Sequence, residues 1–216
     1  MFCQYIILAE KTIHDGDMEK LVSYIKRHGG YARMKDLRVA SFQTREIASL
    51  VKKGVIEKVK PGLYRLADVG AAGANIGFSD VCRAMPEGVI CLLSAHDYYG
   101  LTTFNPSEVY VAIPHAAKAP SIEYPPVKVF YFRDRFYAPG IEQVRTPLGP
   151  IRIYNMEKTV CDMFRYRKKL GEDLAIEGLK NYLKRKDANI NRLREYATIC
   201  QVKTVLFPYL KAMLVR

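Results

Sequence analysis

Apolar residues recur at intervals of three and four positions in three short segments near the start of the chain, which predicts three helices. We expect them over Met18–Arg27, over Ala32–Arg38, and from Ser41, as the N-cap, to about Lys53. Two further apolar segments flank Pro61-Gly62 and predict a β-hairpin, because proline presets φ for a turn and glycine tolerates a positive φ. This order is typical of a winged helix-turn-helix, whose third helix enters the DNA major groove. A small helical domain that binds protein is the alternative.

The third predicted helix has two chemically different faces. Ile47, Leu50 and Val51 share the face that should pack on the other two helices, whereas Arg45, Ser49 and Lys52 fall on the opposite face. We expect the start of this helix to contact base edges, and its end and the hairpin to contact phosphates. The residues expected to contact DNA are Arg33, Lys35, Ser41, Gln43, Thr44, Arg45, Ser49, Lys52, Lys53, Lys58, Lys60 and Arg65.

The second half of the chain mixes strand and helix patterns. Strands are predicted over Gly88–Leu93, Val109–Ile113, Val127–Phe132 and, as an edge strand, Ile151–Tyr154. Short helices are expected over Ser79–Ala84 and after Ser94 as a cap, and four helices over about 156–168, 172–185, 189–200 and 203–214. The predicted fold class is therefore α+β: a winged helix-turn-helix over residues 1–70, then an α+β domain over 71–216 with a small sheet and a helical C-terminal tail. The glycine-rich segment 67–77 is the expected junction.

Charge favours a polyanionic partner. The 216 residues carry a formal net charge of +12. Between Gly29 and Arg65 there are nine Lys or Arg residues and three Asp or Glu residues, a net +6, so half of the net charge lies in about a sixth of the chain. These basic residues coincide with the third helix and the hairpin, which favours DNA contact over simple solvation of exposed faces.

Other residue patterns argue against several classes of function. The five cysteines are widely spread without a CxxC or Cys/His ligand spacing, so we expect no disulfide framework, metal or cofactor, and a cytoplasmic protein. The apolar segment 5–9 is too short for a signal peptide, and no segment reaches the ~20 apolar residues of a membrane span. His96-Asp97 and His115 lie in separate predicted elements, so an acid–base or metal site there is disfavoured.

An aromatic segment near the middle of the second domain has two interpretations. Its aromatic residues are interleaved with Arg133 and Arg135, as in a surface that stacks bases. A half-buried strand also selects aromatic residues, and this interpretation is favoured. The aromatic residues are Tyr124, Phe130, Tyr131, Phe132, Phe136 and Tyr137.

Several sequence blocks resemble a known family. They read GLYRL at 62–66, LLSA at 92–95 with YGLT at 99–102, EVYVAIP at 108–114, and YNMEKTVCDMFRYR at 154–167 followed by KLGEDLA at 169–175. Over about residues 15 to 200 the chain resembles the AbiEi antitoxins, the transcriptional regulators of AbiE-type (type IV) toxin–antitoxin abortive-infection systems. The second-domain blocks are the more specific part of this resemblance, because winged helices are widespread.

The resemblance implies a function that is not enzymatic. It implies a repressor that binds double-stranded operator repeats near its own promoter, where it could act as a dimer, and a C-terminal domain that counteracts a nucleotidyltransferase-like toxin without a stable complex. Two alternatives stay open: an orphan regulator without a toxin, and a winged-helix protein with a nuclease-like catalytic C-terminal domain. The nuclease would need clustered acidic residues with a lysine, and no convincing set is apparent in the sequence.

Overall fold

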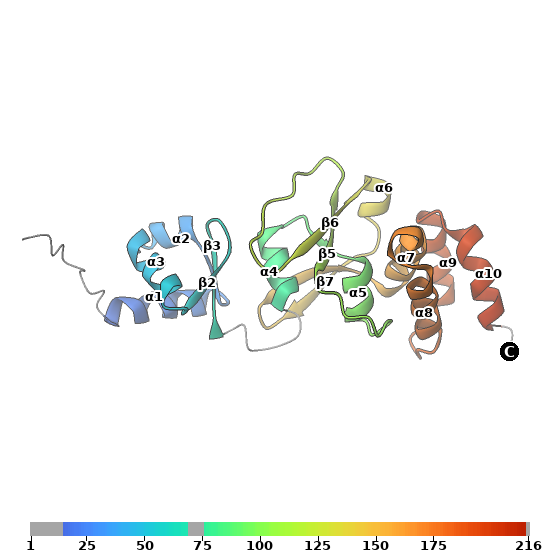
Figure 1. Cartoon of the computed structure of the whole chain (residues 1–216), viewed down its shortest axis with the longest axis horizontal. Coiled ribbons are helices and arrows are strands. Elements are labelled where there is room, and N and C mark those ends of the chain that lie inside the picture. The colour runs from blue at the N-terminus through green and yellow to red at the C-terminus, as the bar shows by residue number, and fades with distance from the viewer. Residues whose placement is uncertain (1–14, 69–75, 215–216) are drawn as a thin grey trace, which may run out of the picture. The chain divides into compact units, whose positions relative to one another are not determined.

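The computed structural model describes residues 15–68 and 76–214 (Figure 1). The expected junction at 67–77 lies largely outside the described residues, as do the apolar segment 5–9 and Cys3. The chain divides into two compact units, residues 1–58 with 62–71 and residues 59–61 with 72–216, which we call the N-terminal and C-terminal units. No helix among the described residues is long and apolar enough to span a membrane.

The N-terminal unit is a winged helix-turn-helix. Its elements are α1 (Asp15–Arg27), β1 (Tyr31–Arg33), α2 (Met34–Val39), α3 (Thr44–Lys52), β2 (Ile56–Lys60) and β3 (Leu63–Leu66). The strands form a sheet of order β1-β3-β2, in which β1 and β3 are antiparallel. Strand β1 was not predicted, because three residues are too short to show a period of two. The segment assigned to the second helix therefore begins with a strand.

The three helices of this unit end in the same way. The residue after each C-cap has a positive φ: Gly29 (73°), Ser41 (68°) and Gly54 (69°). In each case the two N–H groups beyond the cap donate to carbonyls of the last turn, as in a Schellman motif. The helices pack around a core in which Leu21, Leu37 and Leu50 are among the buried residues.

The predicted N-cap at Ser41 is wrong. The Ser41 N–H donates to the Arg38 carbonyl and the Phe42 N–H donates to the Leu37 carbonyl, both at 3.0 Å, so Ser41 completes the end of α2. Phe42 packs against the core, and Gln43 is the N-cap of α3. A serine side chain is suitable both at the end of α2 and at the N-cap of α3, and only the backbone path around Phe42 distinguishes the two positions.

The C-terminal unit contains a mixed five-stranded sheet and a layer of helices. The strands are β4 (Val89–Ile90), β5 (Val109–Pro114), β6 (Val127–Phe132), β7 (Ile141–Thr146) and β8 (Gly149–Tyr154), in the order β6-β5-β4-β8-β7. Pairs β5–β6 and β4–β8 are parallel, and pairs β4–β5 and β7–β8 are antiparallel. The helices are α4 (Ile76–Ala84), α5 (Leu92–Tyr98), α6 (Asp134–Tyr137), α7 (Met156–Leu170), α8 (Glu172–Leu183), α9 (Ile190–Ile199) and α10 (Lys203–Leu214).

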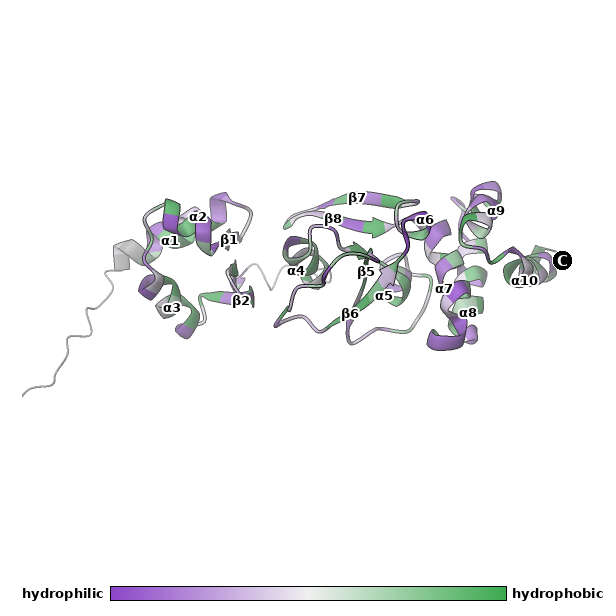
Figure 2. Ribbon diagram, turned by 90° about the horizontal axis from the view of Figure 1, so that it is seen from above, coloured by the Kyte–Doolittle hydropathy of each residue, from purple (hydrophilic) through white to green (hydrophobic). Residues whose placement is uncertain are grey.

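The sheet separates two hydrophobic cores. Side chains alternate across β5, so that Val111 packs with α4 while Tyr110 and Ala112 pack toward α7 to α10. Strand β5 is therefore buried on both faces, and it is largely hydrophobic in Figure 2, whereas β7 at the sheet edge carries several hydrophilic positions. This arrangement confirms the predicted α+β class with a helical C-terminal tail.

Three local expectations in the C-terminal unit are wrong. The apolar segment 88–93 is not one strand, because the chain turns at Leu92 (φ 47°) and begins α5. Ser94 is not a cap: its Oγ accepts from the Tyr110 N–H at 2.8 Å, which anchors the start of β5. Ile151–Tyr154 is not an edge strand, because β7, which was not predicted, pairs outside it. Each of these outcomes depends on a partner distant in sequence.

Candidate nucleic-acid interface

Helix α3 exposes one polar face. Ile47 and Leu50 are each only 1% exposed, whereas Arg45 and Lys52 lie on the opposite face and are exposed. The Gln43 backbone N–H donates to the Glu46 carboxylate at 2.9 Å, half of a capping box that fixes the start of the helix. The geometry therefore presents a rigid, positively charged helix face to solvent.

The other predicted contact residues surround this face. Exposed positions among them are Arg33, Lys35, Ser41, Gln43, Thr44, Arg45, Lys52, Lys53 and Lys58, while Ser49 is half-buried. Lys60, the last residue of β2, is half-buried, and its ammonium donates to the Ala84 carbonyl at 2.6 Å, so it is not available for the expected phosphate contact. In the turn that follows, Gly62 has a φ of 78°, as the hairpin prediction required. The exposed positions come from α2, α3, the turn between them and the β2–β3 hairpin, which we call the wing.

Arg65 does not belong to this surface. Its side chain is 5% exposed and forms an ion pair with Glu57 across the wing. A guanidinium so placed is already neutralised and cannot reach a phosphate without breaking that pair. The expectation that Arg65 contacts DNA is wrong, because β3 is the central strand of the sheet and this side chain is buried there.

Two exposed residues near α3 were not predicted. Ala48 lies on the outward face between Arg45 and Lys52, and its small side chain leaves the helix backbone accessible there. Val39, at the end of α2, is 87% exposed, a position where an apolar group can contact a thymine methyl. The spacing of Arg45, Ala48 and Lys52 is visible in the sequence, but an alanine has no polar group that marks it as a DNA contact.

The histidines of the C-terminal unit belong to different elements and have different surroundings. His96 is completely buried in α5, and burial lowers its pKa to about 4. His115 follows β5 and lines a separate pocket. Within residues 15–68 and 76–214, no group of three His, Cys, Asp or Glu residues could hold a metal ion. Burial raises the pKa of Cys82 to about 11 and that of Cys91 well above its ordinary value.

The block at 154–167 is mainly a packing element. Asn155 caps α7 by accepting from the Lys158 N–H at 2.9 Å, and the Lys158 ammonium forms an ion pair with Asp162 inside the core. Lys158 also lies 4.3 Å from the Tyr154 ring centroid. These buried contacts explain why so many polar residues recur in one short block. Arg165, by contrast, lines a pocket.

Comparison with known proteins gives one match. Residues 19–67 match the family model of the AbiEi antitoxin transcriptional regulators. This segment of the chain is similar to the AbiEi regulator domain. That domain spans all but the first residues of α1 and ends after β3, so the AbiEi match covers the winged helix and the exposed face of α3. None of the curated proteins compared matches the chain. The AbiEi assignment supports a DNA-binding transcriptional regulator and antitoxin of a toxin–antitoxin system.

Proposed function

We propose that this protein represses its own operon by binding operator repeats near the promoter, and that its C-terminal unit counteracts a nucleotidyltransferase-like toxin without a stable complex. The observation that carries the DNA-binding part is the exposed face of α3, with Arg45, Ala48 and Lys52, inside the segment that matches AbiEi regulators. We further propose that the protein binds its operator as a dimer, because a twofold-symmetric protein matches repeated half-sites. We also propose a cytoplasmic location.

The contacts divide by their place on the domain. Gln43, Thr44 and Arg45 stand at the start of α3, from which recognition helices contact base edges. Lys52 and Lys53 at its end, with Lys58 of the wing, are placed for phosphates. Phosphate contacts supply sequence-independent affinity, and base contacts supply specificity.

Operator binding tests this assignment. Fluorescence anisotropy with duplex DNA from the protein's own promoter region should show affinity that falls with salt, and Lys52→Ala should reduce the slope of log affinity against log salt by about one. Arg45→Ala should weaken the operator more than unrelated DNA, because a base contact carries about 1 to 3 kcal/mol of discrimination. Lys180→Ala, an exposed lysine of α8, is the control and should change neither quantity.

If both α3 variants bind the operator as the parent does, with the same salt slope, then α3 is not the recognition helix. The nuclease alternative is tested separately by incubating the same DNA with the protein and a divalent metal ion. Nicking of the DNA that requires the metal ion would contradict the proposed repressor function and indicate a nuclease instead.

A further inference from the structure

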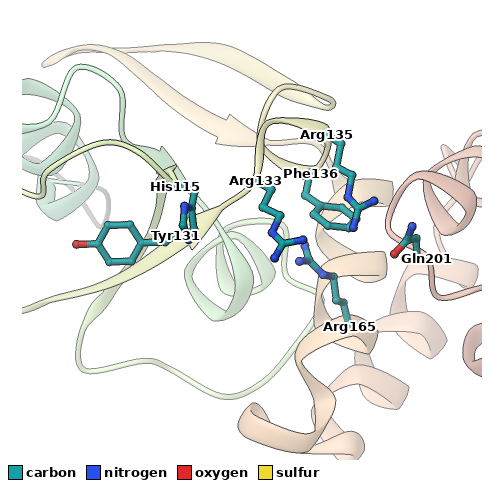
Figure 3. A pocket seen from close by; sticks show the side chains of 7 residues that line it. All are labelled: His115, Tyr131, Arg133, Arg135, Phe136, Arg165 and Gln201. Atoms are coloured by element: carbon teal, nitrogen blue, oxygen red, sulfur yellow. The ribbon is translucent and has the colours of Figure 1, made fainter.

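A basic cavity lies within the C-terminal unit, where β6, α6 and α7 meet. Its volume is about 310 Å³, at the lower end of the ~300 to 1,000 Å³ of small-molecule sites. It is lined by His115, Tyr131, Arg133, Arg135, Phe136, Arg165 and Gln201 (Figure 3). Four separate segments of the chain, at 115, 131–136, 165 and 201, supply these residues, so only the tertiary fold brings them together.

Three arginines converge on the cavity without a carboxylate partner. Three other arginines of this unit, Arg167, Arg185 and Arg192, form ion pairs with acidic residues, as Arg185 does with Asp187 at 2.9 Å. In the described part of the chain, no acidic side chain lies within ion-pair distance of Arg133, Arg135 or Arg165. Figure 3 shows the guanidinium groups of Arg133 and Arg165 directed toward one another. Like charges so arranged repel, and an anion between them would remove the repulsion.

Arg165 is held by aromatic rings rather than by hydrogen bonds. Its guanidinium carbon lies 3.5 Å from the Phe136 ring centroid and 5.5 Å from that of Phe132. Stacking of this kind fixes a guanidinium plane but leaves its N–H groups unused. The Nη1 atom is buried and has no hydrogen-bond partner in the protein. A buried, charged donor without a partner is costly, and phosphate oxygens are the acceptors that such a fork binds best.

The remaining wall suits a nucleobase. The Tyr131 side chain is 48% exposed although it is large and aromatic, and base–aromatic stacking uses a ring presented in this way. On the opposite side, Gln201 has a φ of 59° at a helix end where glycine is favoured. The chain thus accepts a strained residue at a position whose amide group lines the cavity.

We propose that this cavity binds a nucleotide, with Arg133, Arg135 and Arg165 on its phosphates and Tyr131 stacked on its base. The nucleotide could be free in solution or be the phosphorylated end of a single strand, since both present the same groups. This proposal does not depend on operator binding, because it concerns the C-terminal unit alone.

Calorimetric titration of the full chain with the four ribonucleoside triphosphates tests the site. The double variant Arg133→Ala/Arg135→Ala should lower the affinity about a hundredfold or more, because each lost charge-assisted contact weakens binding about tenfold or more. Both side chains are exposed, so the fold should survive, and circular dichroism checks this. Arg194→Ala removes one exposed arginine of α9 outside the cavity and should leave the affinity unchanged.

Two further comparisons define the ligand. Tyr131→Ala should weaken the nucleotide but not inorganic tripolyphosphate, which has no base. If free nucleotides fail to bind while a short 5′-phosphorylated oligonucleotide binds through the same arginines, the ligand is the phosphorylated end of a single strand rather than a free nucleotide. The protein with Arg45→Ala and Lys52→Ala should bind nucleotide as the parent does, which separates this site from the operator surface.

The proposal fails if no nucleotide and no phosphorylated oligonucleotide binds, or if the double variant and Arg194→Ala lose affinity equally. It also fails if tripolyphosphate binds as tightly as any nucleotide, because the base then contributes nothing. Binding of duplex DNA alone through these arginines would likewise overturn it and would make the cavity part of a duplex-binding surface.

Discussion

Replacing Gly178 by alanine sets two well-defined effects against each other. Gly178 is buried in α8, and a Cβ built there would lie 1.8 Å from Nε2 and 2.1 Å from Cε1 of His96. In a helix interior, alanine is favoured over glycine by about 1 kcal/mol. A methyl group forced into a filled core costs about 1 to 3 kcal/mol. Because the overlap involves a completely buried ring, we expect the upper part of that range and a net destabilisation of about 1 to 2 kcal/mol.

Urea denaturation followed by circular dichroism measures this balance in the transition of the C-terminal unit. The four proteins required are the parent, Gly178→Ala, His96→Ala and the double variant. His96→Ala is itself destabilising because it leaves a cavity. In that background the overlap is gone, so Gly178→Ala should be neutral or stabilise by up to about 1 kcal/mol. Equal destabilisation by Gly178→Ala in both backgrounds would refute contact with His96 as the cause.

Two further predictions concern buried ionisable side chains. Burial lowers the pKa of His96 from 6.5 to about 4, so the unfolded chain binds the proton more readily. The contribution of His96 to stability should therefore be constant above pH 6.5 and decline as the pH falls toward 4, by up to about 1.4 kcal/mol per pH unit. Urea midpoints across this range should show a shallower decline for His96→Leu, and identical profiles would contradict the assignment. Lys158→Met should destabilise the C-terminal unit by about 3 to 5 kcal/mol because it leaves Asp162 buried without its cation, and adding Asp162→Leu should recover part of the loss. Thermal denaturation of the single and double variants measures this, and a single variant as stable as the parent would show that the ion pair is dispensable.

The sequence by itself determined those helices, strands and turns that depend on residues close together in the chain. Apolar residues spaced three and four positions apart predicted α3. Pro61-Gly62 predicted the turn of the wing, in which Gly62 has a φ of 78°. The strands near 109–113 and 127–132 followed from runs in which β-branched and aromatic residues predominate. For these segments, backbone conformation and side-chain periodicity are set within a few residues.

Only the tertiary structure decided which of these residues are available to a ligand. Arg65 carries the same charge as Lys58, yet it is removed from the surface because β3 is the central strand and Glu57 lies opposite. Conversely, Arg133 and Arg165 are 32 positions apart in sequence and meet at one cavity because β6 and α7 pack together. Burial and charge pairing depend on neighbours contributed by distant segments, and a single sequence does not specify which segments those are.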